Sequence, residues 1–207
     1  MSMLETAYNK IYSNNKGESI FGEGKPENVV VNILNYLKSG SAFEFGAGEG
    51  RNSLFLARNG FKVKVLDISS VGIKKIQEIA KGNNIEIKAD IGDIRNFKFD
   101  QNFDVFVSTF VLQHLKKDEA LKIIKLMQDH TSKTGLNALT VFMKKGEFLE
   151  KNEENLNFFP NENELRNLYK DWEILRYGEH EVMTGEKNKD GSNKMNFSAD
   201  LLARKKN

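Results

Sequence analysis

The apolar residues change their spacing along the chain, from helical periodicity to strand-like runs and back. Helical periodicity is found in Ile73–Ile79 and in Lys117–His130. Between such stretches we expect strands, namely the residues before Gly46, Phe61–Leu66, Ile85–Ala89, Phe103–Val107 and Leu139–Phe142. Strands that alternate with helices in this way predict an α/β fold with a doubly wound, mostly parallel sheet.

The end of the chain departs from this alternation. Asn161–Lys170 is expected to be a short helix, with Glu164 in the position of a capping-box partner. Two strands follow directly, Trp172–Val182 and Met195–Ala203. Their connection contains the pair Asp190-Gly191, which favours a reversing turn. We therefore predict a C-terminal antiparallel hairpin on the parallel sheet.

Residues 1–40 are expected to form a helical lead-in to a core over residues 41–207. Val30, Ile33 and Leu37 recur at helical spacing, and Gly40 stands where a left-handed C-terminal cap is expected. A chain of 207 residues is long enough for one domain with a substantial core and too short for two comfortable ones. We predict a single domain over 1–207.

Composition narrows the function classes. A net charge of +2, from 31 basic and 29 acidic residues, creates no large field, so nucleic acid is not an expected partner. The absence of cysteine excludes disulfides, thiolate nucleophiles and thiolate metal sites. No stretch resembles a signal peptide or a membrane span, so we expect a cytoplasmic protein without a membrane partner.

One glycine-rich segment carries the most functional information, and it reads Glu44-Phe45-Gly46-Ala47-Gly48-Glu49-Gly50. Its place between an expected strand and an expected helix is typical of a site for a nucleotide-like cofactor. A dinucleotide site needs the pattern G-x-G-x-x-G, and here Arg51 occupies the position of the third glycine. Glu44 lies two residues before the first glycine, where its carboxylate can meet a positive charge. A cationic cofactor therefore fits better than a pyrophosphate.

A second acidic residue supports a cofactor site. The expected strand Phe61–Leu66 ends in Asp67, 21 residues after Gly46, about where an acid holds ribose hydroxyls in nucleotide-binding folds. The alternative for Asp67 is a turn-forming or helix-capping role before Ser69 and Ser70.

These residues resemble motif I and the ribose-binding acid of class I S-adenosylmethionine (SAM)-dependent methyltransferases. The resemblance implies SAM as cofactor, a seven-stranded sheet and a loop that holds the amino-acid and ribose portions of SAM. It further implies that Asp67 binds the ribose, that Asp90 and the N–H of Ile91 bind the adenine, with Asp93 as a rival for Asp90, and that Ser108 lies where the methyl group meets its acceptor. The full set of implied cofactor-binding residues is Glu44, Gly46, Ala47, Gly48, Gly50, Asp67, Asp90, Ile91, Asp93 and Ser108.

The acceptor half of the site is less defined. The segment from Ser108 to Val111 lacks the Asp/Asn-Pro-Pro-aromatic motif of enzymes that methylate DNA bases. His114 and His180 are candidates for a general base, each with a structural role as the alternative. Alternation along a strand would turn His180 away from Glu179 and Glu181, so we expect no metal site there.

Two longer stretches, Gly48–Gly60 and Glu164–Lys206, resemble the tellurite-resistance (TehB-like) methyltransferases, and Phe21–Pro26 is similar to related small-molecule methyltransferases. That family carries a His-Arg pair in its final hairpin, whereas the nearest positions here are Gly185 and Glu186. The departure places tellurite in doubt as the acceptor.

The function expected from the sequence is SAM-dependent methyl transfer to a small-molecule acceptor by direct in-line displacement. A non-catalytic SAM-binding module is the first alternative, and a nicotinamide-dependent oxidoreductase is the second. The sequence leaves open the acceptor, the use of a general base and the oligomeric state.

Overall fold

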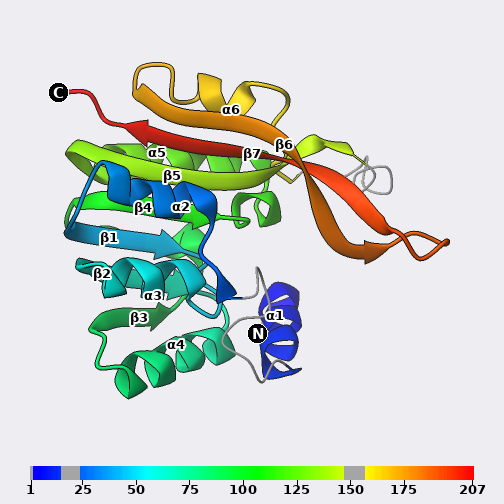
Figure 1. Ribbon diagram of the computed structural model, residues 1–207, viewed down its shortest axis with the longest axis horizontal. Coiled ribbons are helices and arrows are strands. Elements are labelled where there is room, and N and C mark those ends of the chain that lie inside the picture. The colour runs from blue at the N-terminus through cyan, green and yellow to red at the C-terminus, as the bar shows by residue number, and fades with distance from the viewer. Residues whose placement is uncertain (1, 15–23, 147–156) are drawn as a thin grey trace.

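The fold is built around one mixed sheet. A computed structural model describes residues 2–14, 24–146 and 157–207. In these ranges seven strands form a sheet in the order β3-β2-β1-β4-β5-β7-β6 (Figure 1). The strands are β1 (Gly40–Phe45), β2 (Phe61–Asp67), β3 (Ile87–Ile91), β4 (Phe103–Thr109), β5 (Thr131–Gly146), β6 (Glu173–Lys187) and β7 (Asn193–Arg204). Strands β1 to β5 pair in parallel, and β7 runs antiparallel to both β5 and β6.

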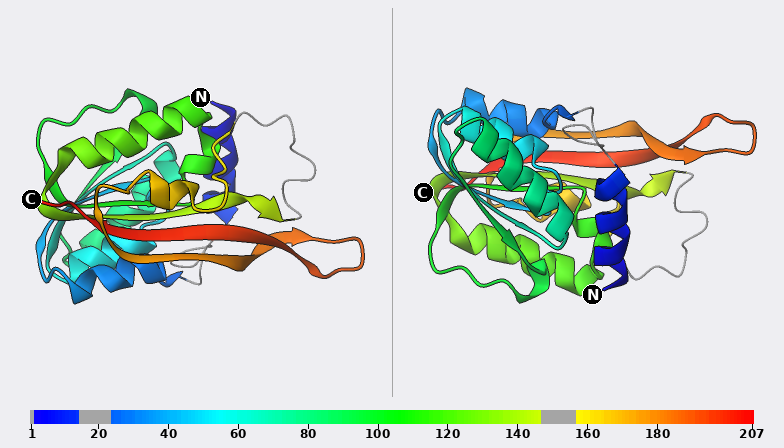
Figure 2. Two further views of the ribbon diagram at one scale, coloured as in Figure 1. Left: turned by 90° about the horizontal axis from the view of Figure 1, so that it is seen from above. Right: turned by 90° about the horizontal axis from the view of Figure 1, so that it is seen from below.

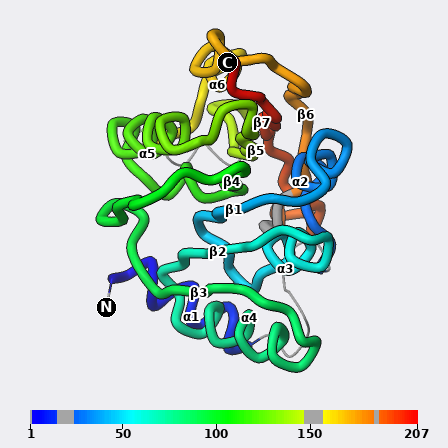
Figure 3. The backbone as a smooth tube through the Cα atoms, turned by 90° about the vertical axis from the view of Figure 1, so that its left-hand side faces the viewer, coloured from blue at the N-terminus to red at the C-terminus, as the bar shows by residue number. Residues whose placement is uncertain are grey.

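Helices cover both faces of the sheet (Figure 3). The α-helices are α1 (Met3–Asn14), α2 (Asn28–Val31), α3 (Arg51–Arg58), α4 (Ser70–Gly82), α5 (Lys117–His130) and α6 (Glu164–Asn167). Short 3₁₀ turns are η2 (Asn32–Asn35), η3 (Ile94–Asn96) and η4 (Leu112–His114). Helices α2, α3 and α4 lie on one face, and α5 and α6 lie on the other. None of the helices in the described ranges is long and apolar enough to cross a membrane.

Alternation along the strands divides the core into two apolar clusters. On β1, Phe43 and Phe45 point into the cluster beneath α5, while Ala42 points into the cluster beneath α2 and α3. Val107 on β4 also belongs to the second cluster, so Thr109, two residues further, faces the same side. The carboxyl ends of the parallel strands therefore present two distinct sets of side chains.

The predicted doubly wound sheet with a terminal hairpin is confirmed. The helix expected at Lys117–His130 has those bounds, and its first turn is closed by Glu119, which accepts a hydrogen bond from the N–H of Lys116. The hairpin turn also forms as expected, with Gly191 at φ +87° between β6 and β7. Figure 2 shows the tip of this hairpin extending beyond the rest of the fold.

Two predicted boundaries near the site were wrong. Gly40 does not cap a helix but begins β1, because the preceding 3₁₀ turn already ends at Asn35 and Gly40 pairs with Phe61 of β2. A glycine is required there because a Cβ would lie 2.8 Å from Oδ2 of Asp104. The third strand was expected at Ile85–Ala89 and instead covers Ile87–Ile91. The N–H of Ile85 bonds to the carbonyl of Ala80 and closes the end of α4. Asp90 and Ile91 consequently lie within β3 and not after it.

The helix expected at Asn161–Lys170 is also shorter, with α6 limited to Glu164–Asn167. Asn163 adopts a left-handed conformation at φ +58° immediately before it, which delays the start of the helix. The predicted contact of Glu164 does form, since its Oε2 accepts a hydrogen bond from the N–H of Asn161 at 2.9 Å.

Candidate cofactor site and a neighbouring pocket

The glycine loop connects the end of β1 to the start of α3, and all three of its glycines are required both by their left-handed backbone and by lack of space for a Cβ. At Gly50, with φ +89°, a Cβ would lie 2.7 Å from Cγ1 of Ile76. Gly46 and Gly48 have φ values of +63° and +58°. A Cβ on Gly46 would lie 2.3 Å from Cγ2 of Val111, and one on Gly48 would lie 2.8 Å from the hydroxyl of Tyr12. Ala47 between them is buried, and Gly50 is the N-cap of α3.

Glu44 lies at the end of β1 with only 1% of its surface exposed. Its Oε1 accepts a hydrogen bond from Nδ2 of Asn52 at 2.9 Å, whereas its buried Oε2 has no hydrogen-bond partner among the described residues. Burial raises the pKa of Glu44 to about 7, against the opposing effects of the Asn52 amide, the Arg51 charge and the nearby Ser53 hydroxyl. The single proton of the Ser53 hydroxyl is donated to the carbonyl of Gly50 at 3.2 Å and not to Glu44. A buried carboxyl oxygen without a partner is costly, so it fits a site that a donor group or a cation completes.

Asn52 connects three elements around the site, and the sequence analysis missed it. Its Nδ2 also donates to Oγ1 of Thr109 at 2.9 Å, and its Oδ1 accepts from the N–H of Glu27 at 2.8 Å. The ends of β1 and β4 are thereby fixed to the segment before α2. The available signal was a polar residue in the first turn of a helix directly after a glycine loop.

Asp67 ends β2 with 7% of its surface exposed. Its Oδ2 accepts from the N–H of Gly48 at 2.8 Å, and its Oδ1 accepts from the N–H of Ser69 at 2.7 Å. Burial raises its pKa, with these two hydrogen bonds acting in the opposite direction. The turn-forming alternative is thus realised, and Asp67 also holds the glycine loop. Each carboxylate oxygen retains a further lone pair, so a role toward a ligand remains a prediction.

Helix α1 lies beside the carboxyl edge of the sheet (Figure 1). Its Tyr8 hydroxyl is 2.8 Å from Nε2 of His114, and Oδ1 of Asn9 accepts from the hydroxyl of Ser69 at 2.7 Å. Burial, with a smaller effect of the Asp67 charge, raises the pKa of Tyr8 to about 12, and burial lowers the pKa of His114. His114 is therefore a half-buried partner of α1 whose lowered pKa favours the neutral form, and its role as a base remains a prediction.

Replacing Tyr8 with phenylalanine is expected to loosen α1. The change leaves Nε2 of His114 without its partner and should lower the free energy of unfolding by about 1 kcal/mol. Hydrogen exchange should show faster exchange in α1 than in the rest of the chain. Tyr36→Phe is the matched control, because Tyr36 lies on the surface away from α1. Equal exchange in both variants would show that the Tyr8–His114 contact does not hold the helix.

The residues expected to contact an adenine ring separate into two faces of β3. Ile91 pairs with Asp67 and is 59% exposed, which gives an apolar surface beside the ribose candidate. Asp90 pairs with Leu66 on the opposite face, and its carboxylate lies 3.7 Å from Nζ of Lys64. Asp93 caps η3, and hydrogen bonds from Arg95 hold its pKa low. The geometry favours Ile91 over both acids as a neighbour of Asp67.

Ser108 lies at the centre of the sheet, but on the face opposite to Glu44 and Asn52. Its side chain is fully buried on the α5 face beside Phe45, and its hydroxyl has no partner among the described residues. Thr109 instead faces Asn52, and the following residue, Phe110, takes the left-handed conformation at φ +55°. Such backbone strain at the end of a central strand is typical of functional sites.

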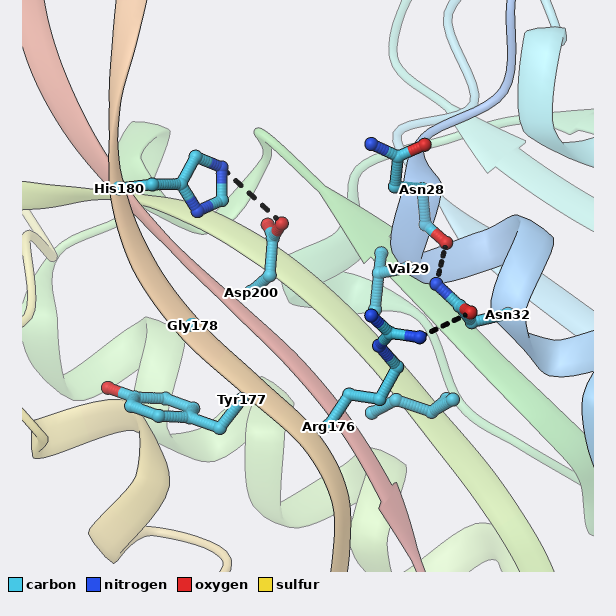
Figure 4. A pocket seen from close by; sticks show the side chains of 9 residues that line it. Asn28, Val29, Asn32, Arg176, Tyr177, Gly178, His180 and Asp200 are labelled. Carbon is cyan, nitrogen blue, oxygen red and sulfur yellow. Dashed lines mark hydrogen bonds and ion pairs between the residues drawn. The ribbon is translucent and has the colours of Figure 1, made fainter.

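A cavity of about 230 Å³ lies beside this network, between α2 and the β6–β7 hairpin (Figure 4). In it, Nε2 of His180 is 3.6 Å from Oδ2 of Asp200, and Oδ1 of Asp200 accepts from the hydroxyl of Thr140 at 2.7 Å. Burial raises the pKa of Asp200, although Thr140 and His180 act against this. The cavity is lined by Asn28, Val29, Asn32, Arg176, Tyr177, Gly178, His180, Asp200 and Leu202.

Among the described residues, no three His, Asp or Glu side chains lie close enough together to hold a metal ion, in the hairpin or elsewhere. Glu179 accepts from the hydroxyl of Tyr177, while His180 faces Ser198 and Asp200. The side chain of Glu186 and the first half of the segment Phe21–Pro26, residues 21–23, lie outside the described residues.

A family model and a curated relative identify the same family. The family described as Tellurite resistance protein TehB matches residues 19–201. A curated relative, the probable S-adenosyl-L-methionine-dependent methyltransferase TehB of Haemophilus influenzae (strain 10810), is 34% identical over 181 residues, which are 86% of this chain and 61% of that relative. The chain thus spans less than two thirds of the length of this relative.

Solved structures show the same fold. The crystal structure of TehB from Haemophilus influenzae has a TM-score of 0.77 at 28% identity, covering 98% of this chain and 67% of that chain. The magnesium protoporphyrin IX methyltransferase of Synechocystis PCC 6803, solved with bound SAH, has a TM-score of 0.69 at 18% identity, covering 98% of this chain and 94% of that chain.

Proposed function

Because the chain belongs to the TehB family of tellurite resistance proteins, we propose that it transfers the methyl group of SAM to a small-molecule acceptor by direct in-line displacement. The observation that carries the proposal is the buried, unpaired Oε2 of Glu44 beside the glycine loop. SAM bears an ammonium group on its amino-acid end, and such a group supplies both the donor and the charge that this oxygen lacks.

Other residues of the site fit the remaining parts of SAM. The left-handed turns at Gly46 and Gly48 let the backbone approach a ligand closely, and Asp67 has lone pairs for the ribose hydroxyls. Exposed Ile91 offers an apolar surface to the adenine ring. We propose these contacts, with Asp90, Asp93 and Ser108 as less favoured positions.

The bound cofactor supplies an electrophilic methyl group on its sulfonium. The protein then has to align the acceptor and exclude water, for which the buried Asn52 network and α1 provide fixed walls. A base is needed only where the acceptor arrives protonated. Tellurite is not proposed as the acceptor, since the final hairpin carries Gly185 and Glu186 in place of a His-Arg pair.

The oxidoreductase alternative has little support in the geometry. Arg51, which stands in place of the third glycine of a dinucleotide site, donates hydrogen bonds to the carbonyl of Lys25 and to the carboxylate of Glu27.

Calorimetric titration with SAM, S-adenosylhomocysteine and NAD tests the proposal. Saturable binding of the first two and not of NAD is expected, and binding of NAD alone would overturn it. Turnover of SAM across small acceptors separates an enzyme from a non-catalytic binding module.

Asp67→Asn is expected to raise the Kd for SAM about tenfold or more, because the ribose hydroxyls lose a charged acceptor. The amide also places an NH₂ group against Gly48 or Ser69, so thermal unfolding must be measured alongside calorimetry. Asp100→Asn removes the same charge at an exposed position and serves as the control. Unchanged affinity in a folded Asp67→Asn protein would remove Asp67 from the site.

A further inference from the structure

The pocket between α2 and the hairpin continues the polar network of the cofactor site. Thr109 pairs with Thr140, Thr140 pairs with Asp200, and Asp200 pairs with Gly178 across neighbouring strands. Residues paired in register lie side by side on one face, so this row begins at the Asn52 contact and ends in the pocket. The end of the pocket at Asp200 is therefore the end nearer to the proposed cofactor.

Arg176 supplies a positive charge at the other end of the pocket. Its Nη1 donates to Oδ1 of Asn32 at 2.9 Å, and no carboxylate lies within ion-pair distance of it among the described residues. Figure 4 shows the guanidinium beside Asn32 of η2, with Asn28 one turn earlier at the start of α2. An arginine fork without an acidic partner, next to amide groups, is suited to bind a carboxylate.

Asp200 and His180 supply acceptors at the end nearer to the cofactor. The side chain of Asp200 is 25% exposed and that of His180 is 50% exposed, so both reach the cavity. Between the two ends of the pocket, Gly178 has no side chain to fill the space, and Val29 and Leu202 provide apolar walls. Arg176 pairs with Leu202, which makes Asp200 its diagonal neighbour across the two strands, at about 7–8 Å between backbones.

We propose that this pocket binds the methyl acceptor, and that the acceptor is a small carboxylic acid with an O–H or N–H group at the end opposite its carboxylate. The carboxylate binds Arg176, an apolar body crosses Gly178, and the O–H or N–H group donates to Asp200 beside His180. The acceptor role rests on the proposed function, whereas binding to the pocket does not.

The placement also accounts for the proton in the reaction. The acceptor oxygen or nitrogen forms the new bond to the methyl carbon as the bond from that carbon to sulfur breaks, and S-adenosylhomocysteine leaves. The proton of the O–H or N–H group passes to the Asp200–His180 pair and from there to solvent, because His180 is exposed.

A proton NMR titration tests binding on the whole chain, which has three histidines and hence few imidazole signals. The probes are 4-hydroxybenzoate, benzoate, which lacks the donor, and 4-hydroxybenzyl alcohol, which lacks the charge. We expect 4-hydroxybenzoate at millimolar concentration to shift the His180 signal and to bind more tightly than both analogues. No shift of His180, or equal binding of the alcohol, would overturn the proposal.

Two variants test which group of the ligand binds at each end of the pocket. Arg176→Gln should weaken 4-hydroxybenzoate binding about tenfold or more, and Asp200→Asn should remove its advantage over benzoate. Arg166→Gln is the matched control, because Arg166 is exposed and lies over the ring of Tyr177, which points away from Arg176 and Asp200 (Figure 4). Equal binding by Arg176→Gln and the control would overturn the assignment. SAM calorimetry on the same samples separates this outcome from failure of the proposed function.

Discussion

Replacing Gly72 with alanine is expected to lower the free energy of unfolding by about 3 kcal/mol and to abolish SAM binding. A Cβ on Gly72 would lie 2.4 Å from the carbonyl oxygen of Gly48 and 3.0 Å from its carbonyl carbon. Both atoms are backbone, so no side-chain rotation relieves the contact. The first turn of α4 cannot withdraw easily either, because the N–H of Gly72 bonds to the hydroxyl of Ser69. The strain must displace the cofactor loop, which denaturant unfolding and calorimetry will detect.

The same helix contains a matched control. Gly82 is the last residue of α4, and a Cβ there would meet no atom within 4 Å. Gly82→Ala should therefore leave SAM binding unchanged and raise stability by up to about 1 kcal/mol, since alanine loses less backbone entropy in a helix. Similar losses in both variants would show that helix content, and not the approach of α4 to Gly48, determines the effect.

The elements predicted most accurately are those whose signals are local. The helix Lys117–His130 combines helical periodicity with a glutamate that closes its own first turn. The third strand was predicted two residues too early, because both Ile85 and Ile87 fit the alternation of a strand in the sequence. Its true start is set by pairing of Ile87 with Val63, a contact that no pattern within the strand encodes.

The same distinction divides the candidate site. Glu44, the glycine loop and Asp67 fall within one strand-helix-strand unit, so their order in the sequence reveals them. Tyr8 and His114 are 106 positions apart, and Thr140 and Asp200 are 60 apart. Only the strand order brings β7 beside β5, and the pocket against α2 follows from that order. The roles of Arg176 and Asp200 were therefore visible only in three dimensions, whereas Asn52 lies within the local unit and its position after the glycine loop was an available signal.

Glu44→Gln is expected to weaken SAM binding by roughly 10- to 100-fold, because the cationic end of the cofactor loses its buried charged partner. The glutamine oxygen can still accept from Asn52, so the fold should be retained. Glu86→Gln, on the exposed segment before β3, removes the same charge without touching the loop. Equal affinity of the two variants would place the ammonium group elsewhere.

The same substitution should change how stability depends on pH. The pKa of Glu44 rises from 4.5 to about 7 in the folded chain, so between these values the folded state holds a proton that the unfolded state has lost. The slope of stability with pH is then negative, and Glu44 destabilises the fold progressively from about pH 4.5 to 7, by about 3 kcal/mol in total. The free energy of unfolding of the wild type minus that of Glu44→Gln, measured across this pH range, isolates the contribution of Glu44 from those of other groups.

Proton release on cofactor binding provides a second measurement. A positively charged ligand at Oε2 lowers the pKa of Glu44, so SAM binding near pH 6 should release a proton, which calorimetry in buffers of different ionisation enthalpy measures. A flat difference between the two proteins across this range, with no proton release, would show that Glu44 is already ionised and that its unpaired oxygen does not await a cation.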